Sequence, residues 1–131
     1  GKVHDETAYI LGGVAGHAGM FSTIKDMSKF LQMILNKGTY NGNKVLSPVT
    51  VDKLFKPHAS KTVGNSCMKL QRSIGWIVKD YNSSSGDLTS EETIDHTGFT
   101  GTNVCIDRIN KDIFVSCNCL LNLFGYFLIH V

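Results

Sequence analysis

The sequence predicts an α+β fold, in which two helices precede an antiparallel sheet of about four strands and pack on it. Two observations lead to this prediction. Apolar residues recur with a helical period in the first half of the chain, and short β-rich runs separated by turn residues fill the second half. The chain has 131 residues, of which 42% are hydrophobic and 18% charged, so we expect a single packed domain over residues 1–131.

The first 21 residues are rich in glycine, which occurs five times there. The stretch LGGVAGHAGMF, residues 11–21, predicts a tight loop whose backbone closely approaches another part of the protein. His17 lies within this loop and could equally well point into a pocket or serve the structure. The preceding pair His4–Asp5 could lie beside a substrate, but a structural role is the favoured interpretation.

Residues 23–37 are the clearest predicted helix. Their apolar side chains share one face at the spacing i, i+3, i+4, i+7: Met27, Phe30, Leu31 and Ile34. Ser22 or Thr23 can cap the start, and Thr23 with Asp26 approximates a capping box. The pair Lys37–Gly38 ends the helix, because glycine readily adopts the left-handed conformation found there.

A shorter helix and a series of strands follow. Asn41–Gly42 marks a turn, and Ser47 then caps a helix that Pro48 opens and Pro57 stops. Residues 58–72 are polar and predict no regular element. Beyond them, four β-rich runs predict an antiparallel meander: residues 73–80, 93–98, 102–109 and 112–121.

The strongest candidate site is the stretch DHTGFTGT, residues 95–102, where a predicted strand ends in His96, Thr97 and Gly98. Gly98 would let a ligand lie against the strand edge, whose free N–H and C=O groups could pair with it or stabilise an oxyanion. The His96 imidazole could donate a hydrogen bond to a substrate carboxylate or tune a nearby nucleophile. From the residues alone, a hairpin turn with a packed histidine is the alternative.

Four stretches, taken in order, resemble the second half of a serine β-lactamase-related hydrolase: GGVAGHAGMFSTIKDMSKFLQMILNKG, SPVTVDKL, SIGW and DHTGFTGTNVCID. This group contains class C β-lactamases, D-alanine carboxypeptidases, penicillin-binding proteins, and related esterases and amidases. The resemblance covers the chain from about residue 3 to residue 121, and it implies a partial β-lactamase/transpeptidase-like fold. In such proteins a K-T-G motif lies on a strand that lines the active site. The resemblance therefore implies that His96, Thr97 and Gly98 bind substrate, with His17 beside the same pocket.

The resemblance also implies a serine nucleophile in an S-x-x-K motif, followed by Y-x-N or S-x-N, and we identify no catalytic residue in this chain. Ser22 and Lys25 have the S-x-x-K spacing. Lys25, however, is predicted on the polar face of its helix, where it stays protonated, and the family has a structural helix at this point. Ser116–Asn118 matches S-x-N only by its letters. We therefore expect a C-terminal fragment of a larger hydrolase domain that is inactive alone.

The predicted function is that of a serine hydrolase fragment, which acts by acyl transfer on cell-wall peptides, β-lactams or esters. The alternative is a non-catalytic module that binds peptidoglycan stem peptides or a partner chain. Apolar surface left exposed by absent segments would favour self-association. The family commonly works in the cell envelope or outside the cytoplasm, but no signal peptide is recognisable and the compartment is left open.

Composition argues against several other classes of protein. The net charge of +2, with no run of lysine or arginine, gives no basis for nucleic-acid binding. The apolar tail, residues 120–131, is far shorter than the ~20 residues of a membrane span, and its secondary structure is left open. The histidines lack metal-ligand spacing, so we expect neither a metal nor a cofactor. Trp76 is interpreted as part of the core. The cysteines are interpreted as small buried residues: Cys67, Cys105, Cys117 and Cys119.

Overall fold

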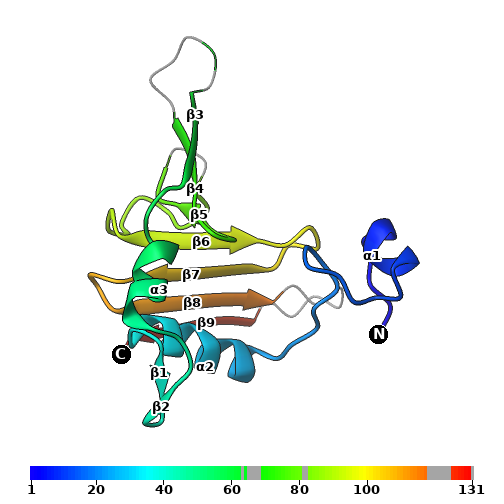
Figure 1. The fold of residues 1–131 in the computed structure, drawn as a ribbon, viewed down its shortest axis with the longest axis horizontal. Coiled ribbons are helices and arrows are strands. Elements are labelled where there is room, and N and C mark those ends of the chain that lie inside the picture. Colours follow the sequence, from blue (N-terminus) through cyan, green and yellow to red (C-terminus); the bar gives the residue numbers. More distant parts are fainter. Residues whose placement is uncertain (63, 65–68, 81–82, 118–124, 131) are drawn as a thin grey trace.

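The computed structural model describes residues 1–62, 64, 69–80, 83–117 and 125–130 (Figure 1). Its helices are α1 (Glu6–Ile10), α2 (Ile24–Leu35) and α3 (Pro48–Leu54). Its strands are β1 (Thr39–Tyr40), β2 (Asn43–Lys44), β3 (Ala59–Thr62), β4 (Lys69–Arg72), β5 (Ile77–Val78), β6 (Thr93–Thr97), β7 (Asn103–Asp107), β8 (Asp112–Cys117) and β9 (Gly125–His130). The β3–β4 hairpin projects from one side of the body, and the segment that contains α1 projects from another (Figure 1).

Seven strands form one antiparallel meander in the order β3-β4-β5-β6-β7-β8-β9, and β1 pairs with β2 in a separate hairpin. This confirms the α+β class, and the four predicted runs contain β5, β6, β7 and β8. The sheet is larger than the predicted four strands by β3, β4 and β9. All four residues of β3 are exposed, so this strand has no buried face whose apolar alternation could reveal it in the sequence.

The core lies between the helices and one face of the sheet, as predicted. α2 and α3 supply one side of it, and alternate residues of the central strands supply the other. Ile94, Ile106 and Ile113 are fully buried and stand opposite one another across β6, β7 and β8. The core cluster is Leu31, Met33, Ile34, Val51, Phe55, Val78, Ile94, Ile106, Ile113 and Val115, with Trp76 packed against it.

The ends of α2 follow the predicted chemistry. Thr23 is the N-cap: its hydroxyl accepts a hydrogen bond from the Asp26 N–H (3.2 Å) and donates one to the Asp26 carboxylate (3.0 Å). At the other end, Lys37 and Gly38 both have positive φ, 53° and 92°. Their N–H groups donate to the carbonyls of Ile34 and Met33, which is the Schellman pattern. Both neighbouring residues therefore take the left-handed conformation, where the sequence predicts only Gly38.

Arg108 ties α3 to the sheet. Its guanidinium donates to Asp52 on α3 (2.7 Å) and to Glu92 beside β6 (2.8 Å), and it lies 4.7 Å from the centre of the Phe55 ring. Arg108 thus links α3, the residue before β6 and the core residue Phe55. None of the described helices is long and apolar enough to cross a membrane.

Candidate substrate-binding site

The predicted site lies where β6 runs beyond its neighbour β5. β5 pairs with β6 only at Ile94 and Asp95, whereas β7 pairs with it along its whole length to Thr97. The Gly98 N–H donates to the Thr102 carbonyl on the β7 side (2.7 Å). Because successive residues of a strand direct their backbone groups to opposite edges, the N–H and C=O of Thr97 point to the edge that β5 leaves uncovered. At this edge the Thr97 N–H faces outward, whereas the Thr97 carbonyl oxygen already accepts a hydrogen bond from His96 Nδ1, and His96 and Gly98 direct their backbone groups to β7.

The His96 side chain is exposed, on the helix-covered face of the sheet that also carries Ile94. Its Nδ1 lies 2.8 Å from the Thr97 carbonyl oxygen, so Nδ1 carries the proton and donates this hydrogen bond. In the neutral ring, Nε2 is then left as an acceptor directed away from the backbone. The imidazole is therefore not the packed histidine of the alternative interpretation.

Gly98 has a structural reason to be glycine. A Cβ atom there would come closer than 3.0 Å to the Thr102 hydroxyl, a separation that real Cβ atoms essentially never show. Thr102 occupies this space because Gly98 and Thr102 close the β6–β7 hairpin, whose loop ends at Gly101 with φ 86°. The space beside Gly98 that was predicted for a ligand is thus filled by the protein itself, at least in the direction of a Cβ.

The N-terminal segment reaches the same end of the sheet. The ring of His4 lies 5.1 Å from the ring of Phe99, with an angle of 30° between the planes. Asp5 caps α1 by accepting from the Ala8 N–H (2.7 Å), and its carboxylate also pairs with His17 Nε2 (2.9 Å). The Ala8 hydrogen bond and then the His17 hydrogen bond lower the pKa of Asp5. Asp5 and His17 thus act together to fold this segment, while His4 touches the loop of the candidate site.

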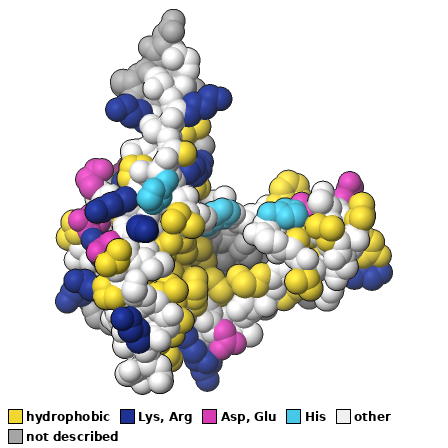
Figure 2. Space-filling model, viewed as in Figure 1, with side chains coloured by type: hydrophobic (Ala, Val, Ile, Leu, Met, Phe, Trp, Pro, Cys, Tyr) yellow, Lys and Arg dark blue, Asp and Glu magenta, His cyan; other side chains and the backbone are white. Residues whose placement is uncertain are grey.

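The glycine-rich loop folds tightly back on itself, as predicted. A Cβ on Gly19, whose φ is 95°, would lie 2.7 Å from the Gly13 carbonyl oxygen and 3.2 Å from the Val3 side chain. Figure 2 shows hydrophobic side chains gathered between this segment and the helix-covered end of the sheet. The loop lies at the hairpin end of the sheet, and within it His17 pairs with Asp5 rather than with the residues of the β6 edge.

Ser22 lies outside α2 and is exposed. The cap is Thr23, and the hydroxyl of Ser22 makes only a long contact of 3.5 Å with the Thr23 carbonyl. Lys25 is exposed as well. The geometry agrees with the structural interpretation of this S-x-x-K match.

The sequence contains a second S-x-x-K match, Ser66 to Lys69. Ser66 lies outside the described residues, and Lys69 opens strand β4, where it is exposed. A nucleophile and base at this spacing need one helical turn to face each other, which a strand does not provide. Of the S-x-N match, Ser116 lies in β8 and Asn118 lies outside the described residues.

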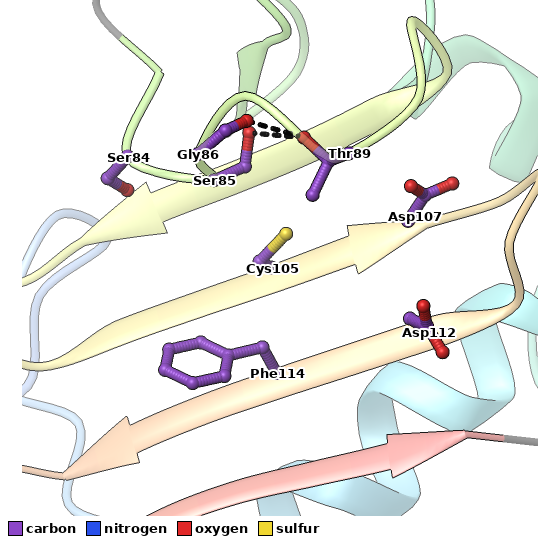
Figure 3. A pocket seen from close by; sticks show the side chains of 8 residues that line it. All are labelled: Ser84, Ser85, Gly86, Thr89, Cys105, Asp107, Asp112 and Phe114. Carbon is purple, nitrogen blue, oxygen red and sulfur yellow. Dashed lines mark hydrogen bonds between the residues drawn. The ribbon is translucent and has the colours of Figure 1, made fainter.

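The opposite face of the sheet carries a shallow pocket under the loop that follows β5 (Figure 3). It is lined by Ser84, Ser85, Gly86, Thr89, Cys105, Asp107, Asp112 and Phe114. Two buried carboxylates anchor the loop. Asp95 accepts from Ser83 (3.0 Å) and from the Ser84 N–H (2.8 Å), and Asp107 accepts from the N–H (2.7 Å) and hydroxyl (2.6 Å) of Ser90. These donors already satisfy the two carboxylates. We therefore interpret the pocket as part of the structure rather than as a binding site.

Cys105 lies under this loop and is 5% exposed, as expected of a small buried residue. Burial, and then the charge of Asp95, raises the pKa of its thiol to about 12, so the side chain stays protonated. The described residues contain no group of three or more His, Cys, Asp or Glu side chains that could hold a metal ion. Cys67 and Cys119, and the side chain of Cys117, lie outside what the structure describes.

Comparison with known proteins identifies the family. A family model described as beta-lactamase matches residues 1–123. The chain is 40% identical over 116 residues to a protein of Salmonella enteritidis named as a D-alanyl-D-alanine carboxypeptidase, and 39% identical over 114 residues to its counterpart in Salmonella gallinarum. Each match includes 84% of this chain but only 24% of the relative, so the chain spans about a quarter of the length of these proteins. Because the family model covers nearly all of its sequence, the chain belongs to the beta-lactamase family of serine hydrolases.

Proposed function

We propose that this chain forms part of the substrate-binding surface of a serine hydrolase that acts by acyl transfer on cell-wall peptides, β-lactams or esters. The observation that supports this most is the uncovered edge of β6 at Thr97, beside the exposed imidazole of His96. An extended acyl donor can pair with such an edge in the manner of an added strand. The names of the Salmonella relatives favour peptides that end in D-alanyl-D-alanine.

The same proposal holds that the chain supplies no nucleophile. Ser22 is a neighbour of the helix cap rather than a serine activated by a buried base. Lys25 is exposed rather than buried beside the Ser22 hydroxyl, as a general base for that serine would need to be. The chain alone would therefore bind acyl donors without cleaving them.

Covalent labelling tests the missing nucleophile. We expect neither a fluorescent penicillin nor a fluorophosphonate to label the folded chain, with a complete serine carboxypeptidase as the positive control. Labelling that disappears in Ser22→Ala would overturn the helix-cap interpretation. Labelling that disappears in Ser66→Ala instead would assign the nucleophile to the second S-x-x-K match.

Non-covalent binding tests the edge itself. A titration of the ¹⁵N-labelled chain with N-acetyl-D-Ala-D-Ala should move the amide signals of residues 96–98. Thr97→Pro removes the N–H that points to the uncovered edge, whereas Thr100→Pro alters the adjacent loop and serves as the control. Binding that survives Thr97→Pro unchanged would contradict the proposed mode.

We also propose that exposed apolar side chains favour self-association. Several large ones are exposed in the segment before α2, and one lies within α2: Tyr9, Ile10, Leu11, Val14, Met20, Phe21 and, in α2, Phe30. Light scattering after size exclusion should show a dimer or larger species at tens of micromolar. A monomer at every accessible concentration would refute this proposal.

A further inference from the structure

Phe99 is an aromatic side chain held in the open, next to the proposed edge. It is the first residue of the loop that joins β6 to β7, directly after Gly98, and it is 91% exposed. Apolar side chains scattered over a surface need no explanation, but an unburied ring at the end of a ligand-binding edge is a specific arrangement. The contacts of the Phe99 ring therefore indicate whether it has a functional role.

The ring is supported on one side by the N-terminal segment. The imidazole of His4 lies 5.1 Å away, tilted by 30°, which is within the range of an offset stacking contact. His4 cannot drift far, because the next residue, Asp5, caps α1 and pairs with His17. Phe99 thus has a backing on one face, while nearly all of its surface stays accessible to solvent.

The position of the ring relates it to the edge. Backbone groups of Thr97 point to the side that β5 leaves uncovered, and Phe99 stands two residues further along the same chain. A molecule that pairs with Thr97 in an extended conformation would bring its next substituent towards the hairpin loop. Phe99 is an exposed aromatic side chain of that loop.

We infer that Phe99, backed by His4, determines specificity by binding a flat or apolar substituent of the acyl donor that lies along the β6 edge. This inference rests on the proposed function, since it presumes that acyl donors bind at Thr97. A donor with a small or charged group in place of this substituent would gain nothing from the ring.

A purely structural role makes a different prediction. If the contact between His4 and Phe99 only docks the N-terminal segment, its loss weakens the binding of every ligand by the same factor. If Phe99 binds a substituent, its loss weakens only ligands that carry an apolar group. The ratio of two affinities therefore separates the two roles, whereas a single affinity does not.

The test compares two probes on the whole chain, N-phenylacetyl-D-Ala-D-Ala and N-acetyl-D-Ala-D-Ala, by titration of the ¹⁵N-labelled protein. We expect the phenylacetyl probe to bind about 3- to 10-fold more tightly, which corresponds to one aromatic contact. Phe99→Ala should bring this ratio to about 1 without changing the affinity for the acetyl probe. Phe99→Leu should retain part of the preference, and His4→Ala should reduce it.

A matched control and three possible outcomes test the role of Phe99. Leu88 is an equally exposed apolar residue in the loop on the opposite face, so Leu88→Ala should leave the ratio unchanged. Equal binding of both probes to the native chain, or a ratio that survives Phe99→Ala, would overturn the role of Phe99 and leave the proposed edge intact. If neither probe binds, the edge itself fails as a binding site, and the inference fails with it.

Discussion

Replacing Gly98 by alanine probes how the end of β6 is built. The new Cβ would come closer than 3.0 Å to the Thr102 hydroxyl, so one of the two groups must move. The φ of Gly98 is not in the left-handed region, and alanine therefore causes no backbone strain of its own. The whole loss of unfolding free energy in Gly98→Ala should therefore come from the clash with Thr102.

The clash sets the magnitude. Turning the Thr102 side chain away from its rotamer costs about 0.5–1.5 kcal/mol, and shifting the hairpin backbone costs about 1–3 kcal/mol, as overpacked sites generally do. We therefore expect Gly98→Ala to lower the free energy of unfolding by about 1–2 kcal/mol. In a Thr102→Ala background the hydroxyl is gone, and the remaining Cβ of residue 102 lies at 3.5 Å, an ordinary contact.

A double-mutant cycle measured by urea unfolding separates these contributions. Gly98→Ala should cost about 1–2 kcal/mol in the native sequence and close to nothing in the Thr102→Ala background, so the coupling energy should be about 1–2 kcal/mol. Thr100→Ala in the same loop provides the control background, where the full cost should persist. Equal costs in all three backgrounds would show that the clash with the Thr102 hydroxyl is not the cause of the lost stability.

Three further predictions concern the support around the site. Arg108→Ala should lower the free energy of unfolding by about 1–2 kcal/mol, since it removes two partly exposed ion pairs and the contact with Phe55, and Arg108→Lys should cost less. With the other three cysteines changed to serine, Cys105 should react with a thiol reagent at pH 8 at least roughly 1000-fold more slowly in the folded chain than in urea, because burial raises its pKa to about 12. Burial raises the pKa of Asp107, but the hydrogen bonds that its carboxylate accepts, those from Ser90 first, outweigh this effect, so its pKa lies below 3.8 in the folded chain. The stabilisation that the Asp107 carboxylate provides should therefore be full above pH 3.8 and disappear as the pH falls below it. A constant difference in unfolding free energy between Asp107→Asn and the native chain from about pH 6 to about pH 2 would contradict this.

The sequence predicts those parts of the fold whose local and global preferences agree. The capping residue and the glycine after the end of α2 are found where they are expected. Of its predicted apolar face, Leu31 and Ile34 are buried and Met27 is partly buried, but Phe30 is exposed. The strands β6 and β7 belong to short β-rich runs between turns, and they lie in the centre of the sheet. By contrast, β3 and β4 form a projecting hairpin held mainly by backbone pairing, which leaves no pattern in the side chains.

The candidate site is predictable only in part, because its neighbours are set by long-range contacts. The H-T-G tripeptide and the glycine loop are visible as motifs, and both lie at the same end of the molecule. The contact between His4 and Phe99 joins residues 95 positions apart, and no local signal announces it.

The strand that carries the site is a core strand at one end and a surface strand at the other. Thr93, Ile94 and Asp95 are fully buried, while His96 and Thr97 are exposed. Ile94 is fixed by the helix-side core, and Asp95 is fixed from the opposite face by the serine loop, so both faces of the sheet hold β6 up to the residue before His96. A rigid support next to exposed polar groups is what a precise binding edge needs, because the geometry of the edge then does not depend on the ligand. It follows that Asp95, although it faces away from the site, should influence ligand binding at Thr97 through the position of the strand.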